Sequence, residues 1–581
     1  MSFYLLQHER RDEGGRKALA SLVGKAGFKA RDPIAIGPWR LMLFDNRGPS
    51  VVHGYSAADG SRRLHAIGLF LHRGLSGEAA LASWHAAQMR GCDPYEGTGG
   101  HFTLIEESNG QLRLFCDGLG AHKIYRSEDG HSFSNSFLAA LLACPARRFD
   151  PFAVAQYVAT GACHGPRTLL DDIRALPANA RLVCAEVSRI ERIAAPIATD
   201  GPYEDMTPEE AVAFCLAPLR AHFGALAHIT GGRVRISFSG GYDSRLMLAL
   251  LRETGIKPEL YVYGPEKDVD VRIAHQVAAG EGLKLHHIDK GATPVPAPEA
   301  MPEILEQALI CFDGWRSTGL FDDGSDAADR ASRHRDGFLP VNGGLGEIYR
   351  NFFNLFDRPY QARDIVNAFY RNYDRGWFGP AFDEAGYIAG TAQAMREQLG
   401  LAPASDSDIP LGPREVQLLY PLFRGRFWTA REAEINQRFG AMSFPYLEHD
   451  VIDRAGRVPL RHKNFGRLQA AMIRAVSPRL AGYKSAYGFS FDRPPSLGYR
   501  LDCLKSMLRP VGLRHRLRHL RKADRTVHDG VLDKGHLAAV IDPDLPVLRH
   551  WFRPEAIDSR DAYNRVVTLE YLAERFSIAA A

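Results

Sequence analysis

Several features that would place the chain in a familiar class are missing from its 581 residues. No uninterrupted apolar run reaches the roughly 18–20 residues that cross a bilayer. The first residues turn polar after position 6, which is not the pattern of a signal peptide or an anchor. The charge is nearly balanced, with 72 Lys+Arg against 68 Asp+Glu, and 45% of the residues are hydrophobic, which excludes a polycation and a disordered chain. We therefore expect a multidomain, cytoplasmic enzyme with no membrane and no nucleic-acid partner.

Paired cysteines are also lacking. The eight cysteines are scattered, with no CxxC pair and no Cys/His cluster at zinc spacing. Several lie in apolar stretches, where a reduced cysteine serves as a small core residue. Position 2 is Ser, and the first cysteine is Cys92. The absence of an early cysteine bears on function below.

The first 195 residues are expected to be rich in β-structure. Asn109-Gly110 separates two alternating runs, 101–108 and 111–118, and this dipeptide between such runs predicts a β-hairpin. Further strands are expected at 34–44, 65–72 and 180–188, and helices near 76–91 and 136–144. Residues 196–206 carry Pro, Gly and acidic residues without an apolar period, which predicts a linker between two domains, 1–195 and 207–581.

The second domain is expected to be α/β and then mainly helical. Thr207, Pro208 and Glu210 form a helix-start signal with a capping box. Strands and helices then alternate; the predicted strands are 233–238, 259–264 and 283–289, and the predicted helices are 245–253 and 269–282. This alternation predicts a parallel, doubly wound sheet. Beyond about residue 295 the pattern is mainly helical to the end.

The segment Ser239-Gly240-Gly241-Tyr242-Asp243-Ser244 joins the first of these strands to a helix. Glycines there let backbone N–H groups approach a ligand, and the helix start adds unpaired donors and partial positive charge, which together favour an anion such as phosphate. Ser239 and Ser244 add hydroxyl donors, and Asp243 is a candidate Mg²⁺ ligand. The segment lacks the Gly-Lys-Ser/Thr ending of a Walker A loop. We predict a turn at GGYDS that binds phosphate.

SGGYDS resembles the pyrophosphate-binding loop (PP-loop) of ATP pyrophosphatases, and other segments narrow the resemblance to the asparagine synthetase-like family. Those segments are 270–278, FPYLEHDVID at 444–453, AGYKSAYGFSF at 481–491 and, in the first half, 99–106, 115–127, 133–161 and 166–182. The resemblance covers nearly the whole chain. It implies an N-terminal glutaminase-like (Ntn-type) β-sandwich domain. It also implies an ATP-pyrophosphatase-like parallel-sheet synthetase domain with a helical C-terminal part.

The resemblance implies that the enzyme uses ATP and Mg²⁺ to form an amide. A carboxylate attacks the α-phosphate, pyrophosphate leaves, and an amine then displaces AMP from the acyl-adenylate. The implied nucleotide-binding residues are Ser239, Gly240, Gly241, Asp243, Ser244 and Gly264. Lys484, in YKSAYGF, is the implied catalytic lysine that stabilises developing negative charge.

Two departures from the family pattern decide the expected sub-function. Glutamine-hydrolysing members expose an N-terminal cysteine, whereas Ser2 follows Met1 here, and serine is a far weaker nucleophile without an arranged base. We therefore expect a first domain that no longer hydrolyses glutamine. The family's second acidic loop appears as 341–347, where Gly346 replaces the usual metal-binding Asp and Gly343 matches neither asparagine synthetases nor β-lactam synthetases. A one-residue gap would instead give Glu347 the catalytic and metal-binding role, alongside Asp243.

A basic run at 513–525 has Arg514, Arg518, Arg521 and Arg525 at helical spacing. A solvated helix face is the first interpretation of this run, and a surface for an acidic peptide or partner protein is the second.

These features favour a ligase that adenylates a small-molecule or peptide carboxylate, and the closest relatives in character are lasso-peptide macrocyclases. A precursor peptide and its processing protease would then be the partners. A β-lactam synthetase-type cyclase and an ammonia-using asparagine synthetase remain open, as does a catalytically decayed nucleotide-binding scaffold.

Overall fold

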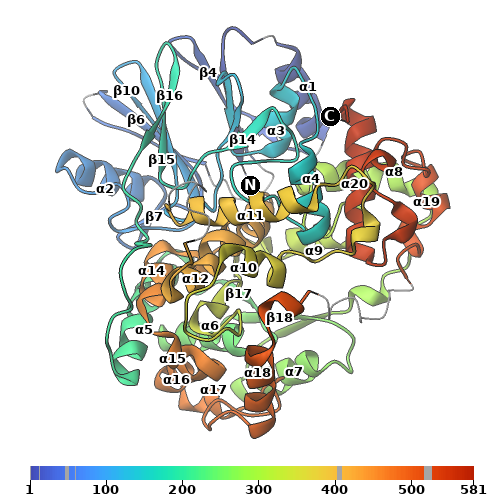
Figure 1. Ribbon diagram of the computed structural model, residues 1–581. Helices are drawn as coiled ribbons and strands as arrows, with labels where there is room; N and C mark the ends of the chain where they lie inside the picture. The colour runs from blue at the N-terminus through green and yellow to red at the C-terminus, as the bar shows by residue number, and fades with distance from the viewer. Residues whose placement is uncertain are drawn as a thin grey trace.

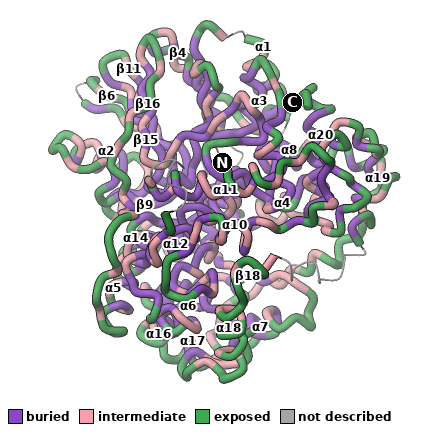
Figure 2. The backbone as a smooth tube through the Cα atoms, viewed as in Figure 1, coloured by how far each residue is buried: buried purple, intermediate pink, exposed green. Residues whose placement is uncertain are grey.

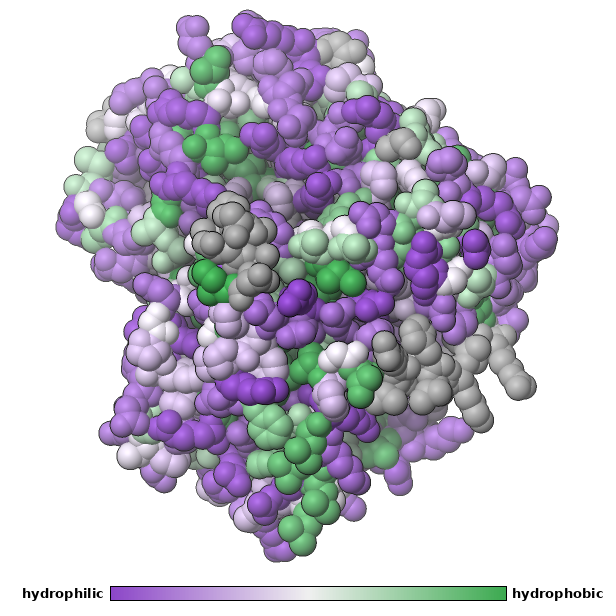
Figure 3. All heavy atoms as spheres, in the orientation of Figure 1, coloured by the Kyte–Doolittle hydropathy of each residue, from purple (hydrophilic) through white to green (hydrophobic). Residues whose placement is uncertain are grey.

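In the computed structural model the chain has a sheet-rich N-terminal half and a mainly helical C-terminal part (Figure 1). The structure describes residues 2–580 except 12, 26, 46–51, 59, 402–408 and 516–525. Buried segments run continuously through the middle of the molecule (Figure 2). The face in Figure 3 is mainly hydrophilic, with scattered hydrophobic patches and a strip of hydrophobic side chains that runs down to its lower end.

Two antiparallel sheets form the N-terminal half. The first has the order β14-β12-β13-β1-β4-β2, with β3 paired to β4. Its strands are β1 (Phe3–His8), β2 (Lys29–Ala30), β3 (Ile34–Ile36), β4 (Trp39–Asp45), β12 (Tyr125–Ser127), β13 (Ser132–Ser134) and β14 (Ile173–Ala175). The second has the order β16-β15-β11-β10-β6-β5. Its strands are β5 (Val52–Ser56), β6 (Arg62–Gly68), β10 (Phe102–Ser108), β11 (Gln111–Cys116), β15 (Ala180–Cys184) and β16 (Ser188–Arg192).

The predicted hairpin is confirmed, since Ser108 pairs with Gln111 and both Asn109 and Gly110 have positive φ angles, as a tight two-residue hairpin turn requires. Three predicted strands are each divided in two. The stretch 34–44 forms β3 and β4, 65–72 falls on β6 and β7 (Leu71–His72), and 180–188 falls on β15 and β16. Strand β7 belongs to a small third sheet with β8 (Leu75–Ser76) and β9 (Thr98–Gly99).

Successive side chains of a strand face opposite sides of its sheet, and this alternation builds four layers. In β1, Tyr4 and Leu6 face the core between the two sheets, and Phe3 and Leu5 face a second core under helices, as the two-residue period of a strand dictates. Helices α1 (Gly14–Lys25), α3 (Phe137–Ala143) and α4 (Pro151–Thr160) cover the first sheet, and α2 (Gly77–Met89) covers the second. The result is a helix–sheet–sheet–helix sandwich.

A four-stranded parallel sheet lies in the C-terminal part, in the order β19-β18-β17-β20. Its strands are β17 (Val234–Ser237), β18 (Glu259–Tyr263), β19 (Leu285–Ile288) and β20 (Leu339–Val341). Helices α6 (Tyr242–Glu253) and α7 (Val269–Glu281) connect the first three, as predicted. Strand β20 is an addition to the mainly helical pattern expected beyond residue 295; it is only three residues long and is followed by a glycine-rich segment, so no alternating pattern marked it.

Helix α5 (Pro208–Thr230) precedes this sheet and has the predicted capping box between Thr207 and Glu210. By length and composition it could cross a membrane. In the structure, its residues Cys215, Leu219 and Phe223 are buried, and the helix lies against α6 and α16. It is therefore a core helix of this fold.

The remaining helices surround the parallel sheet and reach back to the N-terminal half. They are α8 (Met301–Cys311), α9 (Ser325–Ser332), α10 (Ala362–Phe369), α11 (Glu384–Gln398), α12 (Pro413–Leu419), α13 (Ala430–Gln437), α14 (His449–Arg457), α15 (Leu460–Lys463), α16 (Arg467–Val476), α17 (Pro478–Gly482), α18 (Leu497–Leu508), α19 (Lys534–Ala538) and α20 (Arg560–Phe576). A π-helical segment, η7 (Tyr420–Thr429), joins α12 to α13.

The two halves share one hydrophobic core. Side chains of α3 and α4 in the N-terminal half pack with side chains of α8 and α20, and Figure 1 shows α20 beside α4. Asp313, 3% exposed, accepts hydrogen bonds from the backbone N–H groups of Phe137 (2.8 Å) and Leu138 (3.2 Å) and pairs with Arg431 and Arg438. The predicted boundaries at 195 and 207 stay a prediction, because the packing between the halves is continuous.

All eight cysteines are free, and five of them are buried. Burial raises the pKa of the Cys116 thiol to about 12 and keeps it protonated. These thiols therefore behave as the small core residues expected from the sequence.

Candidate functional site

The predicted nucleotide-binding residues meet at one edge of the parallel sheet. Strands β18 and β20 flank β17 and run parallel to it, and the carboxyl ends of the three strands lead to Gly264, to the segment before Glu347 and to the segment at Ser239. Strand order reverses at this point, with β18 on one side of β17 and β20 on the other. Ligands of open parallel sheets bind at such a position.

The Gly240–Gly241 turn has no room for a side chain at Gly240. Gly240 has φ +73°, and a Cβ there would lie 2.2 Å from Cγ2 of Ile273 on α7. Gly241 is the N-cap of α6, and its backbone N–H points to Ser239 Oγ at 3.4 Å. Strand β17 and helix α6 are thus joined by a bare backbone turn, with the N–H groups of a helix start exposed to any anion placed there.

The predicted turn is shorter than expected from the sequence. Helix α6 begins at Tyr242, so Asp243 and Ser244 lie in its first turn and not in the loop. An acidic side chain in the first turn is favoured by the helix dipole. Ser244 is 7% exposed, and its Oγ has no hydrogen-bond partner among the described residues. A buried hydroxyl left unpaired at a helix start fits a ligand that accepts a hydrogen bond.

Asp243 and Glu347 converge on one guanidinium group. The Nη2 atom of Arg350 lies 3.0 Å from Asp243 Oδ2 and 3.4 Å from Glu347 Oε1. Gln469 on α16 also donates to Asp243, at 2.7 Å, and the Tyr420 hydroxyl donates to Glu347 Oε2 at 2.6 Å. Two carboxylates and one arginine therefore form the polar centre of the site.

The electrostatics of this centre are those of a crowded acidic site. Burial raises the pKa of Asp243 to about 6; Arg350 opposes the shift and Glu347 adds to it. Burial lowers the pKa of Arg350, but Asp243 and Glu347 raise it more, and the net shift is upward. Arg350 stays charged and neutralises one of the two carboxylates.

Gly343 and Gly346 lie directly against Asp243, in the segment 341–347 where the family pattern described above has acidic or polar residues. A Cβ at Gly346 would be 2.3 Å from Asp243 Oδ1, and a Cβ at Gly343 would be 2.9 Å from Met247 Cε and 3.4 Å from Asp243 Cβ. The loop therefore has room for the Asp243 carboxylate and not for a second carboxylate at position 346.

Arg245 connects this centre to the predicted catalytic lysine. Its fully buried guanidinium donates to the carbonyls of Gly240 (2.7 Å), Lys484 (3.0 Å) and Tyr483. Lys484 itself is exposed, and its backbone bridges to Ser490. The lysine segment is thus fixed beside the glycine turn, although the role of Lys484 stays a prediction.

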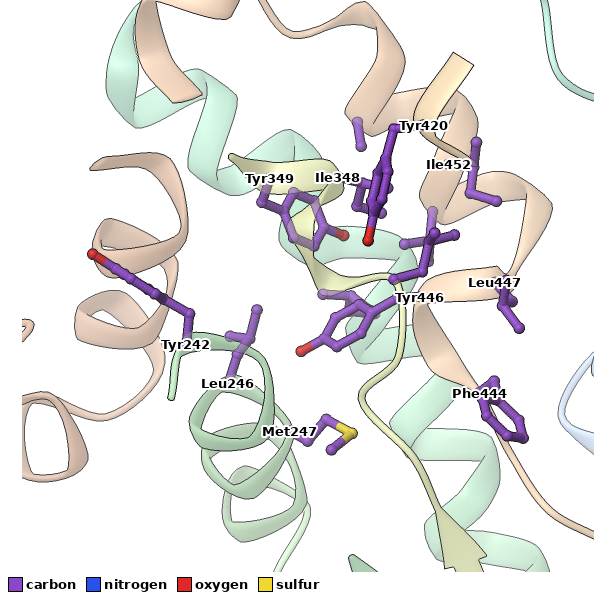
Figure 4. Packing of buried hydrophobic residues seen from close by; sticks show 14 of the residues in the cluster. Tyr242, Leu246, Met247, Ile348, Tyr349, Tyr420, Phe444, Tyr446, Leu447 and Ile452 are labelled. Atoms are coloured by element: carbon purple, nitrogen blue, oxygen red, sulfur yellow. The ribbon is translucent and has the colours of Figure 1, made fainter. Parts of the chain in front are cut away.

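The segment 444–453 also reaches this site. Tyr446 is buried and donates from its hydroxyl to the backbone carbonyl of Asp243 at 2.9 Å, and Figure 4 shows its ring beside the start of α6, with Tyr349 and Tyr420 above it. Two residues later, Glu448 accepts from the backbone N–H of Gly100 at 2.9 Å. One segment thereby connects the site to the N-terminal half.

A cavity of about 330 Å³ adjoins the carboxylates. Its lining includes the charged side chains of Glu347 and Arg350, together with Asn351, Phe352, Phe465 and Tyr499. It has the size of a small-molecule or single-side-chain pocket. A substrate group held there would lie next to Glu347 and Arg350.

The residues present fit one Mg²⁺ ion bound together with phosphate oxygens. Mg²⁺ is held in such sites by one or two carboxylates, with phosphate and water supplying the other ligands. Asp243 and Glu347 provide that pair, and the unpaired Ser244 hydroxyl provides a contact to phosphate. Among the described residues no group of three or more His, Cys, Asp or Glu side chains could hold a metal by itself, so the protein alone does not complete a metal site.

Four residues of this site were not found from the sequence. Arg350 stands three residues after Glu347 and Arg245 directly follows SGGYDS, so their spacing was an available signal. Tyr420 and Gln469 come from distant segments, and no local pattern marks them. The predicted solvated face at Arg514 is wrong, because its guanidinium donates to the carbonyls of Phe353 and Asn354 at 2.8 Å.

The other three arginines of the basic run, Arg518, Arg521 and Arg525, lie outside the described residues. In the N-terminal half, Ser2 is fully buried and donates from Oγ to Asp45 Oδ1 at 2.9 Å. A buried, hydrogen-bonded serine is not presented to a substrate as an exposed nucleophile would be.

Comparisons with known proteins find similarity to solved structures. No family model and no curated protein matches it. Two similar solved structures are the glutamine phosphoribosylpyrophosphate amidotransferase from B. subtilis complexed with ADP and GMP, and the allosteric regulatory enzyme of purine biosynthesis. The first is 8% identical, with a TM-score of 0.20 over 49% of this chain and 65% of that one. The second is 8% identical, with a TM-score of 0.23 over 51% and 82%.

The chain therefore spans less than two thirds of the first neighbour. Likenesses this distant define neither a family nor a function.

Proposed function

We propose that the protein is an ATP- and Mg²⁺-dependent ligase that forms an amide bond by activating a carboxylate as an acyl-adenylate. The observation that carries the proposal is the edge where β17, β18 and β20 end, with a side-chain-free turn at Gly240–Gly241, an unpaired buried hydroxyl at Ser244 and the carboxylates of Asp243 and Glu347. The glycine turn and helix start suit the pyrophosphate of ATP.

In this scheme each group has one task. The N–H groups at the start of α6 and the Ser244 hydroxyl hold the pyrophosphate, which is the leaving group when a substrate carboxylate oxygen attacks the α-phosphorus. Mg²⁺, when bound, neutralises charge on the phosphates. Arg350 holds Asp243 and Glu347 in place, and Lys484 stabilises negative charge on the phosphorus or on the tetrahedral intermediate formed by the amine. AMP is the second leaving group.

The amine is proposed to come from the substrate itself. Residue 2 is a buried serine bonded to Asp45, which argues against ammonia release from glutamine in the N-terminal half. A cytoplasmic lasso-peptide macrocyclase, joining a peptide's N-terminal amine to an Asp or Glu side chain, is our preferred member of this class. A precursor peptide and its processing protease would be its partners. A β-lactam synthetase-type cyclase and an asparagine synthetase are the alternatives within the class.

The test is ATP–pyrophosphate exchange with aspartate, small amino-diacids and candidate peptides. We expect exchange with at least one of these carboxylates, and loss of it in Asp243→Asn. Lys484→Ala should yield no amide product with the fold intact. Asp336→Asn is the matched control, because Asp336 is an exposed aspartate away from the site, and it should exchange at the wild-type rate.

A second class of function is favoured by Gly343 and Gly346, where side chains are missing. If no carboxylate supports exchange, the protein is a nucleotide-binding scaffold and the ligase proposal is wrong. Formation of asparagine from aspartate with glutamine as nitrogen donor would contradict the assignment of Ser2.

A further inference from the structure

Helix α18 exposes a row of four leucines. Leu497, Leu501, Leu504 and Leu508 are 74%, 55%, 37% and 69% exposed, and no residue of the helix is buried (Figure 2). In Figure 3 hydrophobic side chains gather at the lower end of the molecule, where Figure 1 labels α18. Single exposed leucines are ordinary on a protein surface, but a contiguous row is a mark of an interaction site.

The helix is anchored by its other faces, so the leucine row has a defined direction. Tyr499 packs on Tyr487 and Phe489, with ring centroids 5.6 and 5.2 Å apart. At the other end Arg514 donates to the carbonyl of Ser506 at 2.7 Å and to that of Phe353 at 2.8 Å. The leucines therefore face outward because the opposite side of the helix is held by aromatic packing and hydrogen bonds.

The leucine spacing is that of a helix–helix seam. Steps of four, three and four residues put the four side chains within about 60° of arc at 100° per residue. A membrane-surface helix or a core helix presents a broader apolar face of at least about 100°, whereas a strict four-three stripe is the narrow seam of paired helices. The pattern points to a single helix as the occupant.

The charged side chains beside the four leucines of α18 indicate what kind of partner would bind there. Arg500 borders one edge and Lys505 the other, and Arg509 follows the helix; the one acidic residue, Asp502, pairs with Lys505 at 3.4 Å. A second copy of α18 in the same seam would place basic side chains against basic side chains, which opposes pairing. A partner with acidic flanks would place opposite charges together.

We propose that the leucine row of α18 is a docking site for an amphipathic helical segment of another polypeptide, with apolar residues at four-three spacing and Asp or Glu beside them. Tyr499, Cys503 and Met507 of the same helix line the cavity next to Glu347, so a docked segment would lie beside that cavity. The proposal stands on the helix and not on the proposed reaction.

The experiment measures fluorescence anisotropy of labelled synthetic peptides with the full-length protein. One 14-residue helical peptide has leucines at four-three spacing flanked by glutamates, and its partner peptide has lysines in place of the glutamates. We expect the glutamate peptide to bind at least ten-fold more tightly than the lysine peptide, with affinity falling as salt rises.

Leu501→Asp with Leu504→Asp should weaken that binding at least ten-fold. Val187→Asp, at a residue 70% exposed in the N-terminal half, is the matched control and should bind as wild type. Arg500→Glu with Lys505→Glu should reverse the preference so that the lysine peptide binds more tightly. This second variant keeps the leucines, so it tests the site even if the aspartate variant misfolds.

Three outcomes overturn the proposal. The first is equal binding of both peptides, or binding that ignores the leucine substitutions. The second is a leucine-dependent dimer in sedimentation without peptide binding, which makes a second copy the occupant. The third is leucine-dependent binding to phosphatidylserine vesicles in place of the peptides, which makes the helix a membrane contact. None of these measurements depends on ATP–pyrophosphate exchange, so the two proposals fail separately.

Discussion

A single methyl group at Gly346 tests the geometry of the candidate site. A Cβ there would lie 2.3 Å from Asp243 Oδ1 and 2.5 Å from its Cγ. The carboxylate would have to move, which disturbs its hydrogen bond from Gln469 at 2.7 Å and its contact with Arg350 at 3.0 Å. Overpacking costs about 1–3 kcal/mol, and weakening a buried charged hydrogen bond costs about 1–3 kcal/mol. We expect Gly346→Ala to lower the free energy of unfolding by about 2–4 kcal/mol.

The assay is chemical unfolding combined with a double-mutant cycle. Asp243→Ala removes the two shortest contacts and leaves one of 2.8 Å to the Asp243 Cβ. Gly346→Ala should therefore cost about 1–2 kcal/mol less in the Asp243→Ala background than in the wild type, since touching residues couple by this much.

Gly224→Ala is the control, because a Cβ at that helical position meets nothing within 4 Å. It should be neutral or stabilising by up to about 1 kcal/mol. The reasoning fails if Gly346→Ala unfolds at the wild-type midpoint, or if its cost is the same in both backgrounds. Gly346→Asp, which places a larger side chain against the Asp243 carboxylate, should be destabilising as well and should not raise activity.

Three further predictions concern buried groups outside this contact. Arg245→Met leaves buried backbone carbonyls of two segments without their donor, at about 1–3 kcal/mol for each unsatisfied acceptor. Arg252→Met on the same helix should cost less than about 1 kcal/mol in the same unfolding assay. Asp313→Asn removes the charge between the two halves and should destabilise by about 3 kcal/mol or more; a wild-type thermal midpoint would contradict that role. Ser2→Ala should leave amide formation unchanged, and a loss of glutamine-dependent product would show that the serine is a nucleophile.

Much of the scaffold could be predicted because it follows local rules. The hairpin at Asn109-Gly110, the capping box at Thr207 and the strand–helix alternation from 233 to 289 depend on neighbouring residues, and the structure has each of them. Strand β1 was not predicted, because FYLLQH is apolar on both faces and a buried strand of this kind shows no alternation. Strand β20 was missed because three residues are too few to show a period.

The candidate site was predictable only in its contiguous part. The residues of SGGYDS could be assigned from one motif, and the edge of the sheet brings Gly264 and Glu347 to them. The partners that set the electrostatics come from elsewhere in the chain. Gln469 is 226 residues from Asp243, and Tyr420 is 73 residues from Glu347. Such contacts depend on how α16 and η7 pack, which no local pattern encodes.

The core shared by the two halves determines whether the first half could be deleted. A first half that packed independently could be deleted without unfolding the second half. Here its helices α3 and α4 cover α8 and α20, and Asp313 relies on backbone N–H groups of α3. Deleting residues 1–195 would expose that apolar surface and remove the Phe137 and Leu138 N–H groups that donate to the buried Asp313 carboxylate. The first half is therefore needed for the stability of the second half, whatever its own function.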